Sequence, residues 1–211
     1  MEGIIYRTSP YLDSSLLLQV ITPKGLVTLV AKGALKLKSP YRYFCSFLNK
    51  ISFEEKLRPM YSLMNAELIN DYASIKGDLV KINYAVVLFK AISSLIDNFE
   101  LLYGLINEAL ESPYYFQSIL FLLTKILYLE GYGLDFTPSK MNISGFSQLD
   151  SGPLGEWGGQ NVDLSIQEAG WLADISQQKY HDLSDEQLWP LLEFLNKYYN
   201  YHLGINLLTN S

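Results

Sequence analysis

Cysteine and histidine are scarce in this chain of 211 residues, which contains only Cys45, His181 and His202. A single cysteine cannot form an intramolecular disulfide, and this favours a reducing, cytoplasmic setting. Three such residues cannot supply the four ligands of a structural zinc site. Cys45 lies between Phe44 and Ser46, a context that favours a small buried residue over a nucleophile.

The sequence also lacks the common signatures of catalysis. It contains no GxGxxG motif, no Walker loop and no HExxH motif. Adjacent carboxylates occur at Glu54-Glu55 and Asp185-Glu186, but their turn-like surroundings are typical of solvated faces. We therefore expect no enzymatic activity, no cofactor and no bound metal.

Long apolar runs are limited to residues 114–129, which Gln117 and Lys125 interrupt. This run is shorter than the roughly 20 residues of a membrane-spanning helix, so we predict a buried core helix and no membrane partner. Met1-Glu2-Gly3 does not begin a basic segment followed by an apolar one, and we expect no secretory signal.

Charge is unevenly distributed along the chain. Residues 1–70 contain nine Lys/Arg and five Asp/Glu, whereas residues 71–211 contain seven and seventeen, which gives the net charge of −6. Hydrophobic residues make up 49% of the sequence, enough for a substantial core. The asymmetry suggests two units with different partners, the first of them able to bind an anion.

Short apolar segments bounded by turn residues fill the first part of the chain. The predicted strands are residues 3–7, 16–21, 25–31, 47–53 and 61–68. Pro23 and Gly25 suit a hairpin turn between the second and third of them. Five short strands without crossover helices predict an antiparallel barrel, and the OB-fold in particular.

From about Gly77 the apolar residues follow a helical period. Helices are expected after Asn98, after Pro113, from Ser165 with Glu168 completing a capping box, and from near Pro190 to Leu203. The predicted class is therefore α+β, with an OB-fold barrel over residues 1–75 and an all-helical domain over residues 76–211.

Positive charges and aromatic rings alternate in residues 31–44. This segment contains four cations and no acid, and the cations are Lys32, Lys36, Lys38 and Arg42. Tyr41 and Tyr43 lie among them. Binding of single-stranded nucleic acid needs cations for phosphates and flat rings for bases, and the segment offers both. The alternative is a solvated basic loop whose aromatic side chains belong to the core.

Several short motifs share an order with one known family. The N-terminal ones are Glu2-Gly3-Ile4-Ile5-Tyr6-Arg7-Thr8, Tyr11, Asp13, Ser15-Leu16-Leu17, Thr22-Pro23, Gly25-Leu26, Ala31-Lys32-Gly33-Ala34 and Lys38-Ser39. Looser ones are Ala66-Glu67-Leu68, Asn83-Tyr84-Ala85, Gly131-Tyr132 and His202-Leu203-Gly204. Together they resemble the RecO family of recombination mediators.

The resemblance implies an N-terminal OB-fold, a helical domain and a role in DNA repair and homologous recombination. Members of the family bind single- and double-stranded DNA, anneal complementary strands and act with RecR to help RecA replace single-strand-binding protein. No catalytic residue or nucleotide cofactor is implied. Carried onto this chain, the DNA-contacting residues are Arg7, Lys32, Lys36, Lys38 and Arg42.

Two further expectations follow from the resemblance. Many family members carry a four-cysteine zinc module after the Gly-Tyr segment, but residues 135–163 contain no Cys or His, so a metal-free loop or flap is expected there. The acidic tail of single-strand-binding protein should bind the helical domain, with Lys81, Lys90 or Lys125 at the rim of its site. The alternative function is a protein-interaction scaffold with little affinity for DNA.

Overall fold

The computed structural model describes residues 1–56, 58, 60–93, 97–136, 146–147, 152–153 and 164–208. The chain forms two compact units. The first comprises Met1–Ile82 and Asp97–Leu110, and the second comprises Asn83–Ile96 and Glu111–Ser211. A helix from the middle of the chain therefore belongs to the same unit as the N-terminal strands.

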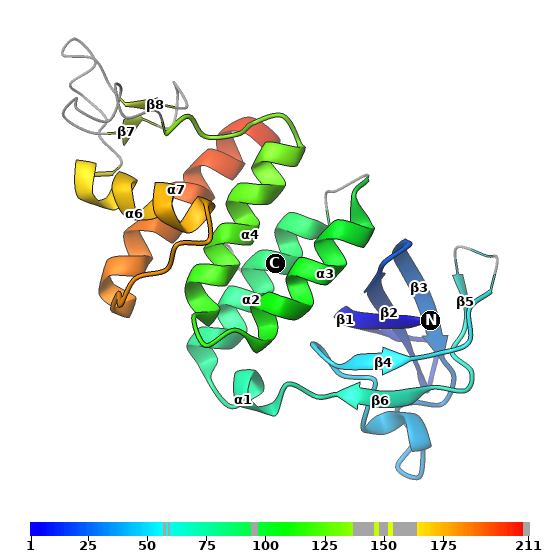
Figure 1. The fold of residues 1–211 in the computed structure, drawn as a ribbon. Coiled ribbons are helices and arrows are strands. Elements are labelled where there is room, and N and C mark those ends of the chain that lie inside the picture. Colours follow the sequence, from blue (N-terminus) through cyan, green and yellow to red (C-terminus); the bar gives the residue numbers. More distant parts are fainter. Residues whose placement is uncertain are drawn as a thin grey trace. The chain divides into compact units, whose positions relative to one another are not determined.

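Six strands form one mixed sheet in the first unit. They are β1 (Glu2–Tyr11), β2 (Ser15–Thr22), β3 (Gly25–Ala31), β4 (Lys50–Ser52), β5 (Met60–Ser62) and β6 (Glu67–Asn70). Their order is β5-β3-β2-β1-β4-β6, and only the β3–β5 pair is parallel (Figure 1). The predicted α+β class is confirmed. The predicted five-stranded antiparallel barrel is wrong, because the sheet has six strands, is open and includes a parallel pair.

The sixth strand arises because the predicted strand over residues 61–68 is divided in two. Asn65 has a φ of 48°, a left-handed conformation that an extended strand cannot contain. On one side of it, β5 pairs with β3, and on the other side β6 pairs with β4. One short stretch of chain therefore supplies both edges of the sheet.

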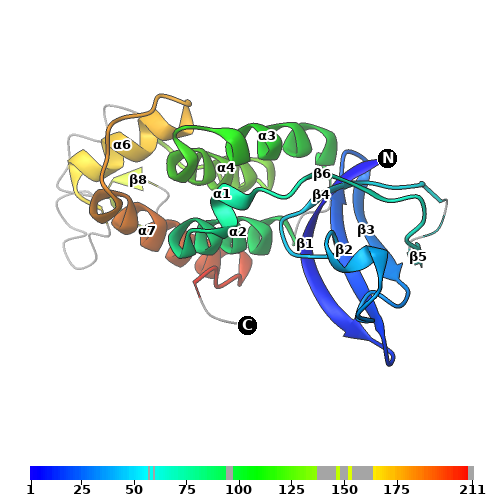
Figure 2. The same cartoon turned by 90° about the horizontal axis from the view of Figure 1, so that it is seen from below.

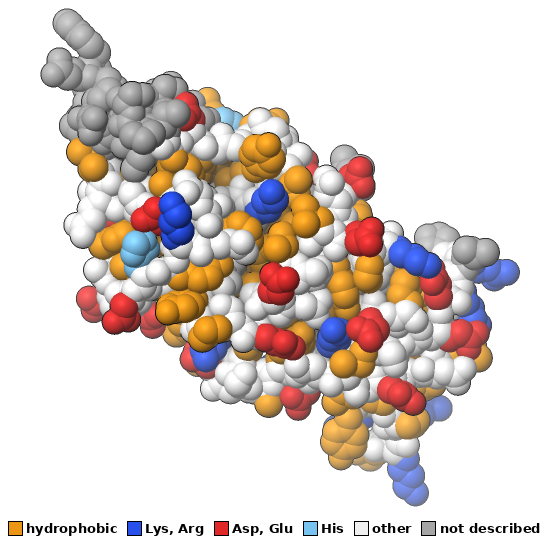
Figure 3. All heavy atoms as spheres, in the orientation of Figure 1, with side chains coloured by type: hydrophobic (Ala, Val, Ile, Leu, Met, Phe, Trp, Pro, Cys, Tyr) orange, Lys and Arg blue, Asp and Glu red, His pale blue; other side chains and the backbone are white. Residues whose placement is uncertain are grey.

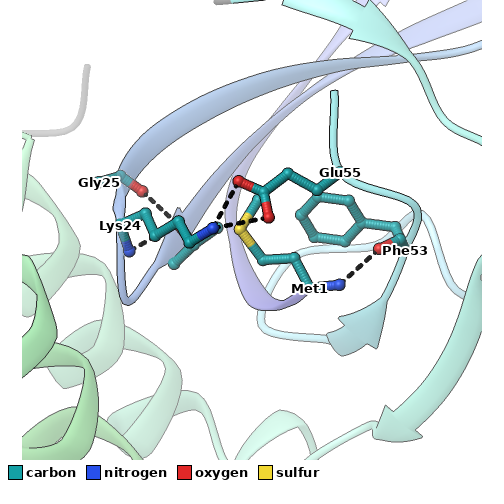
Figure 4. A network of polar contacts seen from close by, with 6 residues as sticks. Met1, Lys24, Gly25, Phe53 and Glu55 are labelled. Carbon is teal, nitrogen blue, oxygen red and sulfur yellow. Dashed lines mark hydrogen bonds and ion pairs between the residues drawn. The ribbon is translucent and has the colours of Figure 1, made fainter. Parts of the chain in front are cut away.

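The predicted hairpin turn between β2 and β3 is confirmed. Thr22 and Gly25 face each other in the ladder, and Thr22 Oγ1 donates a hydrogen bond to the Gly25 carbonyl at 2.8 Å. Gly25 has a φ of 127°, a conformation that favours glycine. Figure 4 shows this turn beside the ion pair between Lys24 Nζ and the Glu55 carboxylate, at 2.8 Å.

The core of the first unit is built mainly by the strands and by the chain around them. One cluster of buried residues in it comprises Ile5, Leu18, Val20, Leu29, Ala31, Ala34, Cys45, Ile51, Phe53, Tyr61 and Leu63. Two helices also belong to this unit: α1 (Ala73–Lys76) and most of α3 (Phe99–Glu111). Ala34 and Cys45 show that the segment between β3 and β4 contributes to the core.

Helices make up most of the second unit. They are the later part of α2 (Leu79–Ile92), then α4 (Tyr115–Leu129), α6 (Ile166–Ser176) and α7 (Asp185–Leu203). Both α6 and α7 pack against α4 (Figure 2). Most of α4 is buried, which confirms that the apolar run is a core helix. No helix in the described residues combines the length and apolarity needed to cross a membrane.

The two C-terminal helices begin at capping boxes. Ser165 and Glu168 exchange backbone and side-chain hydrogen bonds as predicted, at 2.7 and 3.2 Å. The predicted start of the last helix near Pro190 is wrong, because α7 begins at Asp185. Ser184 and Gln187 cap that end, and Pro190 lies inside the helix, where its missing N–H removes one backbone hydrogen bond.

Two very short strands lie in the second unit, so its C-terminal part is not all-helical as predicted. β7 (Phe146–Ser147) pairs with β8 (Gly152–Pro153) in an antiparallel ladder. Both fall in the predicted loop over residues 135–163, and strands of two residues are too short to leave a periodic signal. Residues 137–145, 148–151 and 154–163 lie outside the described residues, so the fate of the zinc module remains a prediction.

Candidate nucleic-acid interface

Residues 32–44, between β3 and β4, form a segment that we call the basic loop. Its backbone forms a series of hydrogen-bonded turns. Lys36 N donates to the Gly33 carbonyl and Ser39 N donates to the Lys36 carbonyl, each at 3.0 Å. The 3₁₀ turn η1 (Pro40–Arg42) follows, and Cys45 N closes the series on the Tyr41 carbonyl at 3.1 Å. The loop therefore has a defined shape before it meets any ligand.

Buried residues attach the basic loop to the sheet near both ends. Ala34 and Cys45 lie in the core, which confirms the predicted burial of the cysteine. Burial raises the pKa of the Cys45 thiol to about 12, so the thiol stays protonated and acts as a packing group. Leu35 N also donates to the Ser14 carbonyl at 3.0 Å, which ties the loop to the turn between β1 and β2.

The cations predicted to contact phosphate are exposed on this loop. Four exposed side chains of the loop form no ion pair within the described residues: Lys32, Lys36, Lys38 and Arg42. The segment contains no acid, and Figure 3 shows basic and hydrophobic side chains together on the part of the sheet unit that projects lowest in that view. Arg7 is exposed as well, on β1 just beyond a register shift. An anion can therefore approach these charges without displacing a partner.

Two other lysines of the first unit have acidic partners. Lys24 pairs with Glu55, and Lys50 Nζ lies 3.3 Å from Glu2 Oε2 and 5.9 Å from the centre of the Tyr103 ring. Such exposed or half-exposed pairs add little stability, but they reduce the attraction of these lysines for phosphate. The basic loop is the densest group of cations in the sequence of this unit, and none of its four has such a partner among the described residues.

The structure separates the two tyrosines of the loop. Tyr43 is 87% exposed, so both faces of its ring are available. Tyr41 is half-buried and packs against the core, and its ring meets Phe44 edge to face at 5.5 Å. Stacking on a base is therefore open to Tyr43, whereas the ring of Tyr41 is committed to the fold.

Two residues that the sequence did not single out hold the end of the loop. The buried Asn49 side chain donates from Nδ2 to the Tyr43 carbonyl at 3.2 Å, and its Oδ1 accepts a hydrogen bond from Lys76 Nζ. Lys76 Nζ also donates to Ser46 Oγ at 3.3 Å. Burial lowers the pKa of Lys76, and Asp71 opposes that shift. Lys76 lies on α1, far along the chain from the loop, so no local pattern could reveal this contact.

The three lysines predicted to border a partner site lie in different settings. Lys81 is in the first unit, whereas Lys90 and Lys125 are in the second. Lys90 Nζ donates to the Leu207 carbonyl at 3.1 Å and so holds the C-terminal segment. Lys125 stacks on the exposed Tyr128 ring at 5.2 Å.

Lys125 also borders a hollow of about 200 Å³ in the second unit. The other lining residues come from α4, the segment after it and the end of α6, and they are Thr124, Tyr128, Gly133, Leu134, Phe136 and Ser176. Lys125 therefore places a positive charge beside a hollow that both polar and apolar side chains line.

Groups suited to catalysis or metal binding are not gathered in the part of the chain that the structure describes. His181 Nε2 lies 2.9 Å from Asp174 Oδ2, and the His181 backbone is bonded to the Gln117 side chain. His202 lies among the rings of Tyr132, Tyr198 and Tyr201. No three His, Cys, Asp or Glu side chains of the described residues converge on one point.

Comparison with protein-family models gives no match, and comparison with curated proteins gives no significant match. The geometry of the basic loop and the residues near it therefore carries the functional interpretation.

Proposed function

We propose that the protein binds DNA through the basic loop and, as its sequence resemblance suggests, serves as a RecO-type accessory of DNA repair and recombination in the cytoplasm. In this role it anneals complementary single strands and acts with RecR to load RecA. The observation that carries the proposal is the loop itself. It presents four exposed cations and an exposed tyrosine in a segment that contains no acid, on a backbone already held in place.

The cations and the exposed ring of the loop complement the phosphates and flat bases of a nucleic acid strand. Each phosphate that a lysine or arginine neutralises releases condensed counterions, and this gain does not depend on sequence. A tyrosine ring adds stacking, which is also tolerant of sequence because every base has a π-face. A protein that anneals strands of any sequence needs both properties. The acidic second unit, by contrast, is unsuited to face phosphate.

The architecture of the sheet supports an OB-type fold, which is a partly open barrel. β1, β2 and β3 form an antiparallel meander, and β3 pairs in parallel with β5. Between β5 and β6 the backbone continues to bond both neighbours: Leu63 N donates to the Val30 carbonyl at 3.0 Å, and Glu54 N donates to the Met64 carbonyl at 3.1 Å. We interpret β5 and β6 as two halves of a fifth OB strand.

The position of the basic loop also supports this function. OB-folds bind oligonucleotides with the face formed by their second and third strands and with the loop between the first and second. Here Leu35 N of the basic loop is hydrogen-bonded to Ser14, in that first turn. The hollow beside Lys125 is our candidate site for a further partner, the acidic tail of single-strand-binding protein. Leu134, Phe136 and the Lys125 cation line it, and they suit a terminal aromatic residue with a carboxylate.

Affinity for a labelled single strand should fall steeply as salt is added. If the four loop cations and Arg7 each contact one phosphate, log affinity against log salt has a slope of about −3.5. Fluorescence anisotropy over a range of salt concentrations measures this slope. Absence of binding at low salt would contradict the proposal and favour the interaction scaffold.

The two loop tyrosines should respond in opposite ways to replacement by alanine. Tyr43→Ala removes a ring that is free to stack, so affinity should fall by roughly 1–3 kcal/mol with little change in salt slope or melting temperature. Tyr41→Ala removes a ring packed on the core, so the free energy of unfolding should fall by roughly 1–3 kcal/mol instead. Equal effects of both changes on DNA binding, in variants that stay folded, would refute this division of roles.

A further inference from the structure

An exposed leucine lies at the most basic part of the loop. Leu37 is 86% exposed, between Lys36 and Lys38 in the chain. Folding has therefore gained almost nothing from the apolar side chain of Leu37. Two other exposed leucines lie on the connected turns: Leu35 on the basic loop and Leu12, which is 77% exposed, between β1 and β2.

The backbone fixes these leucines relative to one another. The hydrogen bond from Leu35 N to the Ser14 carbonyl joins the two turns, and Leu12 has the left-handed φ of 52° that a tight turn requires. Ala34, buried in the core, holds the start of the loop, and the hydrogen bond from Ser39 N to the Lys36 carbonyl spans Leu37. The backbone around Leu37 is therefore held by hydrogen bonds and by the buried Ala34.

We propose that Leu37 inserts between neighbouring bases of the bound DNA strand while the lysines beside it hold the phosphates. This inference rests on the proposed function. Apolar side chains, leucine among them, wedge between base steps in several DNA-binding proteins. The cations adjacent to Leu37 favour a polyanion as the occupant, and a nucleic acid strand offers the flat faces of its bases beside its phosphates.

Insertion of this kind predicts a preference among DNA forms. In an intact duplex the wedge must break base stacking, whereas a single strand offers gaps between bases at little cost. The protein should therefore bind single strands, and duplexes containing a mismatch or an open end, more tightly than intact duplex of the same length. Leu12 and Leu35 would cover the neighbouring bases.

The test compares Leu37→Ala with Leu79→Ala, a matched control. Leu79 is 80% exposed at the start of α2, outside the basic loop. Both are measured with a single strand that contains 2-aminopurine, whose fluorescence rises when its neighbours are unstacked. Leu37→Ala should weaken binding roughly tenfold, with the salt slope kept and the fluorescence rise lost. Leu79→Ala should bind and fluoresce like the unchanged protein, and Leu37→Phe should retain the rise.

The outcomes separate the inference from the function on which it rests. If the unchanged protein shows no DNA binding at low salt, both fail. If it binds with a steep salt slope but Leu37→Ala keeps full affinity and the full fluorescence rise, only the insertion is refuted. Vesicles containing phosphatidylserine test the alternative that Leu37 and its neighbouring cations bind an anionic membrane surface. If Leu37→Ala loses vesicle binding but not DNA binding, the leucine serves a membrane surface and the inference is overturned.

Discussion

Replacing Lys36, Lys38 and Arg42 together by alanine is expected to flatten the slope of log affinity against log salt by about two units. Each of the three side chains is exposed and lacks an acidic partner among the described residues, so each can release counterions from one phosphate. At about 0.1 M salt a change of two units corresponds to roughly a hundredfold loss of affinity. The loss should be similar for every DNA sequence, because no base edge is involved.

A matched change elsewhere on the sheet unit isolates the contribution of the loop. Lys24→Ala removes a lysine of the same unit whose charge is balanced by Glu55, so its salt slope should stay close to that of the unchanged protein. A thermal melt of each variant excludes loss of fold as the cause. A folded triple variant that binds and anneals with the original slope would place the DNA-binding surface elsewhere.

Tyr199→Ala should lower the free energy of unfolding of the second unit by roughly 3–5 kcal/mol. The Tyr199 side chain is fully buried in α7, and its hydroxyl donates to the Leu123 carbonyl of α4 at 2.7 Å. Burial also raises the pKa of Tyr199 well above its usual value. The change removes both the packing and the hydrogen bond that join these two helices, and the cavity it leaves lies where α4 and α7 meet.

Tryptophan fluorescence can follow this unfolding selectively, because all three tryptophans lie in the second unit, at positions 157, 171 and 189. Tyr199→Phe keeps the ring and removes only the donor, and should cost about 1 kcal/mol. Tyr201→Ala, on the exposed side of the same helix, should change the unfolding free energy by less than about 0.5 kcal/mol. A denaturation midpoint for Tyr199→Ala equal to that of Tyr201→Ala would show that the contact contributes nothing.

Local signals explain how far the sequence predicted the fold. The first strands and the turn at Thr22–Gly25 were predictable because short apolar segments and turn residues specify a hairpin over a few residues. The Ser165 capping box was predictable for the same reason. The division of the last strand at Asn65 left one local signal only, an asparagine that tolerates the left-handed conformation, and a single residue does not show that its two flanks pair with different strands. The place of α3 in the first unit depends on contacts between distant segments, which no local pattern records.

The candidate site shows the same limit. The dense group of cations in residues 32–42 was visible in the sequence, because charge and spacing survive without structure. The sequence could not distinguish Tyr41 from Tyr43, although one packs on the core and the other is exposed. Leu37 was overlooked because a leucine in a loop normally marks a core contact. Asn49 was overlooked because its role depends on a lysine of α1.

The bond between Lys76 and Asn49 has a practical consequence for where the DNA-binding unit can be cut. A fragment that ends at residue 75, after the last strand of the sheet, would keep every cation of the basic loop. It would lack the lysine that fixes Asn49, and with it the support of the Tyr43 carbonyl. It would also lack α3, which the first unit includes. The smallest segment that retains the geometry of the loop is therefore defined by an ammonium group on a helix, not by the end of the sheet.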